Sequence, residues 1–224
     1  MPPSGDVKAR ILDVAARLFM EQGFAATSVR EIGERAGVGQ SSLYHHVRSK
    51  GQLLFQLSHG FSSDLLERLT AMAASTPSPT EQLRGVVRVV LAVVESHQAE
   101  VTVFLREGHA LPEGPRQQIQ KERDQVDAMV DRMVSEGIAV GELRPDLDVR
   151  LTRMAILGMC NWTYQWFRPD GAKTSAEIAD YFAGLLLCGL SNVDRRDATI
   201  PTPPTAPPVE RDETADSTEV DGQL

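Results

Sequence analysis

Residues 23–50 read GFAATSVREIGERAGVGQSSLYHHVRSK, and this segment carries the clearest structural signals of the chain. Ser28 followed three residues later by Glu31 is a capping-box pattern, which predicts the start of a short helix. The Gly-Val-Gly sequence at 37–39 is a tight connection, and the run after it predicts another helix over about 40–47. Two helices joined by a short turn that contains glycine form a helix-turn-helix, whose second helix can lie in the major groove of DNA.

Helical periodicity continues on both sides of this motif. Apolar residues share one face of a helix expected over about 6–22, and Gly23 supplies its C-terminal stop. A second capping-box pattern, Ser49 with Gln52, opens a long helix whose apolar stripe reaches Met72. Further helices are expected over about 81–97, 99–108, 115–136, 149–167 with Asp148 as N-cap, and 175–190 with Ser175 as N-cap. No segment alternates with period two over a strand length, so the sequence predicts an all-α protein.

Charge is unevenly distributed along the 224 residues, whose formal net charge is −8. Residues 1–55 hold seven Lys or Arg against five acidic residues, a net charge of +2. Residues 193–224 hold three Arg against eight acidic residues, a net charge of −5, and their prolines and low hydrophobicity predict a disordered tail. An acidic total therefore does not exclude a DNA-binding face at the N-terminus. We expect a helix-turn-helix headpiece over 1–50, a larger helical domain over 51–192 and this tail.

Several functional classes are disfavoured by the composition. Two cysteines, Cys160 and Cys188, are too few for a secreted disulfide framework and favour reduced, buried thiols. The N-terminus has no apolar signal-peptide core, and the longest apolar run, 181–190, is about half of the roughly 20 residues that a membrane span needs. We expect a cytoplasmic protein without membrane association. Nothing after residue 55 has the spacing of a metal site or a catalytic triad, so neither enzymatic activity nor a cofactor is expected.

The second helix of the motif carries short or planar hydrogen-bonding side chains, which suit DNA. Glutamine can pair with adenine, serine with most base edges, and free N–H groups at a helix N-terminus favour a phosphate. The predicted DNA-binding residues are Thr27, Ser28, Gln40, Ser41, Ser42, Tyr44, His45 and Lys50. A hairpin that only packs does not explain the caps, the glycine turn and the polar helix together. A metal site at His45 and His46 is disfavoured, because adjacent helical side chains point about 100° apart.

Residues 23–50, with the helix before them, resemble the DNA-binding domain of the TetR family of transcriptional regulators. The resemblance implies a homodimeric, ligand-responsive regulator, usually a repressor, with a helical ligand-binding and dimerisation domain after the headpiece. It places Gln40, Ser42, Tyr44 and His45 at recognition-helix positions, and Thr27, Ser28 and Lys50 at phosphate-contacting positions. The chain departs from the family pattern at four places, which are Gly39 for a Ser or Thr cap, His45 for Tyr, Val47 for Phe and Gly51 for an acid.

Residues 137–190 are similar to the C-terminal domain of TetR-family regulators of fatty-acid, acyl-CoA or steroid-ring catabolism. This similarity implies an acyl-CoA thioester or related lipid as inducer, and it makes Arg106, Arg153 and Arg168 candidates for a CoA phosphate. It also implies that the last two helices pair with those of a second subunit in a four-helix interface.

Both tryptophans of the chain lie in one short segment beside amide side chains. Aromatic rings next to amides can line an apolar ligand cavity, and they can equally pack a dimer interface or the core, so the sequence leaves both interpretations open. The predicted ligand-binding residues are Phe104, Arg106, Asn161, Trp162, Gln165 and Trp166.

The functional hypothesis is a repressor that binds a palindromic operator as a homodimer and is released by a small apolar or acyl-CoA inducer. Ligand entry would reorient the long helix that begins near Lys50 and change the separation of the two headpieces. The alternative is a lipid or acyl-CoA-binding protein of the same fold without a regulatory role. A nucleoid-like protein is disfavoured, because non-specific affinity rests on many phosphate contacts and the headpiece charge is only +2.

Overall fold

The computed structural model describes residues 7–191, and helices dominate this part of the chain. The elements are α1 (Val7–Gln22), α2 (Val29–Arg35), α3 (Gln40–His46), α4 (Lys50–Ser75), α5 (Pro79–Ser96), α6 (Gln98–Glu107), the 3-10 helix η1 (Gly108–Ala110), α7 (Glu113–Ala139), α8 (Val149–Asn161), α9 (Thr163–Trp166) and α10 (Ser175–Leu190). Within residues 7–191 there is no strand beyond an isolated bridge between Leu143 and Ser191, which confirms the all-α prediction. The tail predicted over 193–224 lies outside the described residues, and the division into domains stays a prediction.

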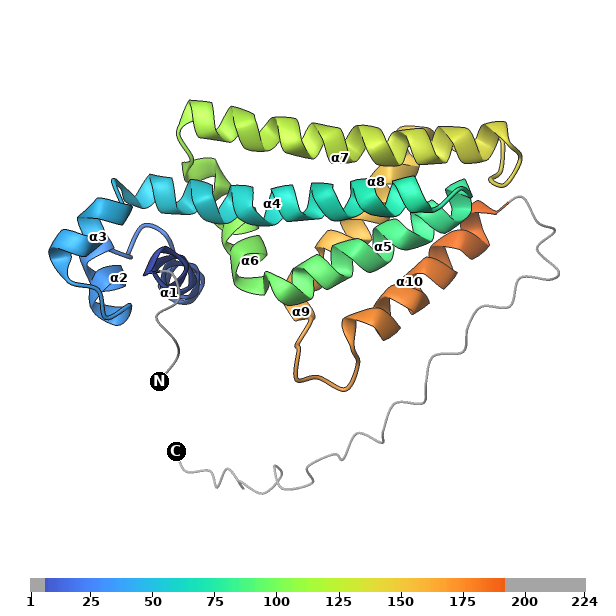
Figure 1. Ribbon diagram of the computed structural model, residues 1–224. Helices are drawn as coiled ribbons and strands as arrows, with labels where there is room; N and C mark the ends of the chain where they lie inside the picture. Colours follow the sequence, from blue (N-terminus) through green and yellow to red (C-terminus); the bar gives the residue numbers. More distant parts are fainter. Residues whose placement is uncertain (1–6, 192–224) are drawn as a thin grey trace, which may run out of the picture.

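Helix α4 connects two groups of helices. Figure 1 shows α1, α2 and α3 clustered at one end, and α4 running from this headpiece along the length of the molecule beside α7. Helices α5, α6 and α7 all pack against α4, and α10 packs mainly against α5. No helix within residues 7–191 combines the length and the apolar character that crossing a membrane requires. The headpiece and the larger group of helices therefore share one long element.

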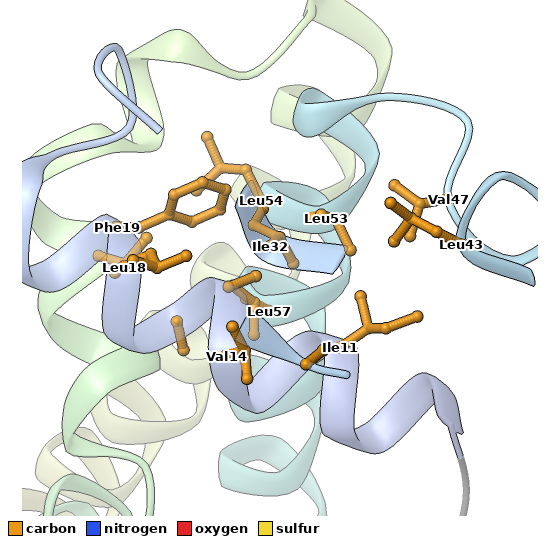
Figure 2. Packing of buried hydrophobic residues seen from close by; sticks show 14 of the residues in the cluster. Ile11, Val14, Leu18, Phe19, Ile32, Leu43, Val47, Leu53, Leu54 and Leu57 are labelled. Carbon is orange, nitrogen blue, oxygen red and sulfur yellow. The ribbon is translucent and has the colours of Figure 1, made fainter. Parts of the chain in front are cut away.

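The headpiece helices pack around a buried apolar cluster, part of which is drawn in Figure 2. Buried side chains from α1, α2, α3 and the first turns of α4 meet there, among them Ile32, Leu43 and Leu54. A Cβ at Gly33 would lie 2.5 Å from a Leu43 methyl carbon, so only glycine lets α2 and α3 approach this closely. Val103 of α6 and other side chains from beyond α4 complete the cluster, so the headpiece is packed against the larger group of helices.

A second buried cluster joins α4, α5, α7, α8 and α10. Val86, Val130 and Ile156 are almost fully buried in it, as is Cys160. Burial raises the pKa of the Cys160 thiol to about 12, so the thiol stays protonated and packs as a small apolar side chain, as the sequence suggests.

Two details of the last helices differ from the prediction. The helix expected over 149–167 is divided at Trp162 into α8 and α9. The Gln165 backbone N–H donates to the Trp162 carbonyl oxygen at 3.1 Å, and the Thr163 hydroxyl donates to the Cys160 carbonyl oxygen at 2.6 Å. The N-cap of α10 is Thr174, which forms a reciprocal capping box with Glu177. Ser175 is instead buried, and its hydroxyl donates to a Glu95 carboxylate oxygen at 2.6 Å.

Candidate DNA-binding surface and ligand cavity

Helix α3 presents a polar face to solvent. Its one fully buried side chain is Leu43, which is fixed in the headpiece core. Tyr44 is 60% exposed. The other exposed members of the predicted set on this helix are Gln40, Ser41, Ser42 and His45. These side chains are therefore free to reach a groove of DNA.

Local hydrogen bonds explain why the turn and α2 form where the sequence predicts. Ser28 is the N-cap of α2, and its hydroxyl oxygen accepts from the Glu31 backbone N–H at 3.1 Å. The Glu31 carboxylate does not return to the cap, because it accepts from the Gln22 side chain at 2.9 Å. Gly37 adopts a φ of +63°, which glycine tolerates and which lets the chain turn into α3. Gly39 caps α3 without a side-chain bond, as its departure from the family pattern implies.

Thr27 does not occupy the position expected of a phosphate ligand. Its side chain is only 2% exposed. The hydroxyl donates to the Gly23 carbonyl oxygen at 2.9 Å and accepts from the Gln22 side chain at 3.2 Å. Thr27 thus fastens the loop between α1 and α2, and this burial disfavours a contact of its side chain with DNA, which stays a prediction.

Lys50 is engaged in the same loop. Its ammonium group donates to the carbonyl oxygens of Phe24, Ala25 and Thr27 at 2.5, 3.0 and 2.8 Å. It also lies 4.5 Å from the centre of the Phe24 ring. An ammonium has three donors, and all three are used here, which favours a role in fastening the loop, while a phosphate contact by Lys50 stays a prediction. These partners lie more than 20 residues away in sequence, and no local pattern could have revealed them.

Helix α6 contacts the headpiece through a hydrogen bond as well as through its buried side chains. The Glu107 carboxylate accepts from the Phe24 backbone N–H at 3.3 Å. Gly51, at the start of α4, lies against Pro112, just before α7. The loop after α1 is therefore held from two sides, by α4 and by α6.

A cavity of about 270 Å³ lies between α4, α5, α6, α7 and α8, and we call it the central cavity. Its apolar lining includes Phe61, Leu65, Val101, Phe104 and Leu157. Two residues of the predicted ligand set, Phe104 and Asn161, line it. The cavity is near the lower end of the volumes typical of small-molecule sites.

The other predicted ligand residues lie outside the lining of this cavity. They are Arg106, Trp162, Gln165 and Trp166, and all four are exposed. Trp162 sits at the break between α8 and α9 and is 62% exposed. Gln165 donates to the neighbouring Tyr164 hydroxyl. For the tryptophans, this placement favours the packing interpretation that the sequence left open.

Charged side chains form one wall of the central cavity, and sequence reasoning singled out only Arg153 among them. Arg153 pairs with Asp127 and, at 2.8 Å, with Asp131. Although partial burial opposes its charge, hydrogen bonds and attraction to these two carboxylates raise its pKa. Glu122 accepts from Ser62 and lies 2.6 Å from a His59 ring nitrogen. Arg153 is thus already neutralised, unlike the free phosphate ligand that the sequence suggested, and Arg168 does not line the cavity.

Comparisons with known proteins agree with this arrangement. Two family models match the chain, "Bacterial regulatory proteins, tetR family" over residues 11–57 and "Tetracyclin repressor-like, C-terminal domain" over residues 76–190. The HTH-type transcriptional repressor KstR2 of Mycobacterium tuberculosis is 33% identical over 192 residues, which cover 84% of this chain and 96% of the relative.

Solved structures give the same result. The structure of the ketosteroid transcriptional regulator KstR2 of Mycobacterium tuberculosis superposes with a TM-score of 0.79 at 31% identity, covering 84% of this chain and 96% of that one. The structure of AibR in complex with isovaleryl coenzyme A and operator DNA superposes with a TM-score of 0.73 at 30% identity, covering 81% and 98%. From its helix-turn-helix headpiece through its helical C-terminal part, the chain belongs to the TetR family of bacterial regulatory proteins.

Proposed function

We propose that this protein is a ligand-responsive transcriptional repressor that binds a palindromic operator as a homodimer and is released by a small apolar or acyl-CoA inducer. The observation that carries the proposal is the double role of α6. Val103 is buried in the headpiece core, while Val101 and Phe104 line the central cavity. A molecule that enters the cavity therefore contacts the helix on which the headpiece rests. The relatives support binding of both operator DNA and an inducer, since one relative is named a repressor and another was solved in complex with isovaleryl coenzyme A and operator DNA.

Helix α4 provides a second connection between the two sites. Its first turns contribute Leu53, Leu54 and Leu57 to the headpiece core, and one turn later Phe61 reaches the central cavity. For release, the inducer must bind the conformation with low DNA affinity better than the conformation with high affinity. A tilt of α4, a shift of α6, or both would change the distance between two headpieces.

A homodimer is supported by the distribution of exposed apolar side chains. Nine large apolar side chains are exposed among the described residues, and five of them fall within the segment from α8 to α10. These five are Leu151, Met154, Trp162, Trp166 and Leu185, which we call the α8–α10 apolar surface, and Met154 among them also lines the central cavity. Such a concentration of exposed apolar side chains is typical of a protein interface. A two-fold dimer would place two α3 helices in successive major grooves of a palindrome.

The test of DNA recognition uses the full chain to select duplexes from a random library, followed by fluorescence anisotropy on the selected sequence. Tyr44→Ala should weaken binding to all sequences, whereas Gln40→Ala should relax the preference at one base position. Gln118→Ala, an exposed glutamine on α7, is the matched control and should change neither. If the wild type enriches no sequence but binds acyl-CoA, the protein is a lipid-binding protein of this fold and the repressor proposal is wrong.

The dimer is tested by sedimentation velocity. Leu151→Glu introduces a charge into the α8–α10 apolar surface and should shift the protein toward monomer. Val140→Glu introduces the same charge at an equally exposed apolar residue at the end of α7, and should leave the oligomeric state unchanged. A wild-type protein that sediments as a monomer at all concentrations contradicts the proposal.

A further inference from the structure

A second hollow of about 320 Å³ lies beside the central cavity, between α6, η1 and the first half of α7. We call it the α6–α7 hollow. It shares the side chains of Phe104, Leu105 and Arg123 with the central cavity, so these three form the boundary between the two spaces. Its floor is apolar, because Leu111 and Ile119 are buried in the headpiece core cluster. A molecule long enough to cross this boundary would occupy both spaces.

The two spaces differ in charge. The central cavity has two arginines, Arg123 and Arg153, against two carboxylates, Glu122 and Asp127. The α6–α7 hollow has Arg116, Arg123 and His109 in its lining, and none of its lining residues is acidic. A negatively charged group is therefore favoured in the α6–α7 hollow and gains no net attraction in the central cavity.

The arginines of the α6–α7 hollow are also available to a ligand. Within residues 7–191, neither Arg116 nor Arg123 takes part in an ion pair, whereas Arg153 takes part in two. The Arg123 guanidinium lies 5.7 Å from the centre of the Phe104 ring, a contact that holds it at the boundary between the two spaces. A guanidinium can bind a carboxylate or a phosphate with two parallel hydrogen bonds.

We propose that the α6–α7 hollow binds the oxyanion end of an amphipathic ligand whose apolar part fills the central cavity, with Arg116 and Arg123 as the anion-binding residues. This inference rests on the proposed function, since it describes where the inducer's charged group binds. The shared chemistry is an oxyanion attached to an apolar body, whether a carboxylate or a phosphate. Gly108, which lines the hollow, directly follows Glu107, whose carboxylate accepts the Phe24 N–H of the headpiece.

Isothermal titration calorimetry of the full chain tests the proposed anion site with four probes that share a ten-carbon chain, which are decanol, decanoate, decyl phosphate and decanoyl-CoA. The anions should bind at least tenfold more tightly than decanol. Arg116→Gln and Arg123→Gln should each weaken the anions about tenfold. Arg116 lines only the α6–α7 hollow, so Arg116→Gln should leave decanol unchanged, while Arg116→Lys should retain most of the affinity for the anions. Arg132→Gln removes the same charge from an exposed position on α7 that lines neither space, and should have no effect.

The outcomes distinguish a carboxylate from a phosphate, and they distinguish failure of the anion site from failure of the proposed repressor function. A loss confined to decyl phosphate and decanoyl-CoA identifies a phosphate as the occupant, and a loss confined to decanoate identifies a carboxylate. If both arginine variants bind the anions as the wild type does, or if decanol binds as tightly as the anions, the proposed anion site is wrong. Release of DNA by these ligands would then leave the proposed function standing. If no probe binds the wild type, the amphipathic anion is the wrong ligand class, while operator selection still decides whether the protein is a regulator.

Discussion

Replacing Lys50 by methionine removes the ammonium but keeps an unbranched side chain of similar length. The ammonium donates to three carbonyl oxygens, of which the bonds to Phe24 and Thr27 are partly buried and the bond to Ala25 is exposed. A net contribution of about 1 kcal/mol for each partly buried bond, little for the exposed one, and about 0.5 kcal/mol for the contact with the Phe24 ring add to roughly 2–3 kcal/mol. We therefore expect Lys50→Met to lower the free energy of unfolding by about this amount.

The assay is thermal unfolding followed by circular dichroism at a fixed protein concentration, because a dimer's melting temperature depends on concentration. For a chain of this size, about 2 kcal/mol corresponds to a fall in Tm of roughly 4–8 °C. Arg48→Met is the control and should leave Tm unchanged, since Arg48 is exposed and makes no ion pair with any residue of the described range 7–191.

The salt dependence of DNA binding by Lys50→Met distinguishes a loop-fastening role of Lys50 from a direct contact with a DNA phosphate. A side chain that contacts a phosphate contributes about one to the slope of log K against log salt, whereas a side chain that only fastens a loop contributes nothing. An unchanged Tm together with a slope reduced by about one would refute the reasoning, and would return Lys50 to the phosphate-binding role that the family resemblance implies.

Three further results are expected. Gly33→Ala places a methyl group 2.5 Å from a Leu43 methyl carbon and should destabilise the headpiece by about 1–3 kcal/mol, measured by urea unfolding; an unchanged midpoint would contradict it. The pKa of His97 is raised by its hydrogen bond to Glu100 and by Asp64, so the folded state favours the protonated ring. The protonated ring therefore stabilises the folded state below the ordinary pKa of 6.5, and this stabilisation is lost as pH rises through the pKa of the folded state. We expect His97→Gln to lower Tm at about pH 5.5 and to lower it much less at about pH 8.5. An equal fall in Tm at both pH values would contradict this. Affinity for non-cognate duplexes should be weak and should fall further as salt is added, as an anisotropy titration at several salt concentrations would show, because residues 1–55 carry a net charge of only +2.

Features that depend on neighbours in the chain were predictable from the sequence. The caps at Ser28, Ser49 and Asp148 form as expected, because each side-chain oxygen accepts a backbone N–H three residues later. The same holds for the turn at Gly37, where a positive φ requires a residue without a Cβ. These signals are local, so they fix the helix-turn-helix without any knowledge of tertiary packing.

Features that depend on distant partners were not predictable. Arg153 was considered as a free phosphate ligand, but its charge is matched by Asp127 and Asp131 on the facing helix α7, more than 20 residues earlier in the chain. The break after Asn161 has no adjacent glycine or proline to announce it, and Trp162, which follows it, is exposed. Both features were hidden from the sequence because helix packing, which periodicity alone does not specify, decides which polar groups meet.

Helix packing also places α6 in contact with both the headpiece core and the central cavity. Neighbouring residues on a helix point about 100° apart, so Val103 and Phe104 on one short helix can face the headpiece core and the central cavity at once. A ligand that shifts α6 therefore acts on a headpiece that is already fixed to it by buried side chains and by Glu107.

Release from DNA requires a large difference in ligand affinity between the two conformations. To turn a population in which 99% of the molecules can bind DNA into one in which 1% can, the ligand must prefer the second conformation about 10⁴-fold. An apolar body in a cavity of about 270 Å³ has few polar contacts with which to reach that preference. An oxyanion bound by Arg116 and Arg123, on the side of α6 nearest the headpiece, would supply the additional differential affinity, which is why the charged end of the inducer matters as much as its apolar part.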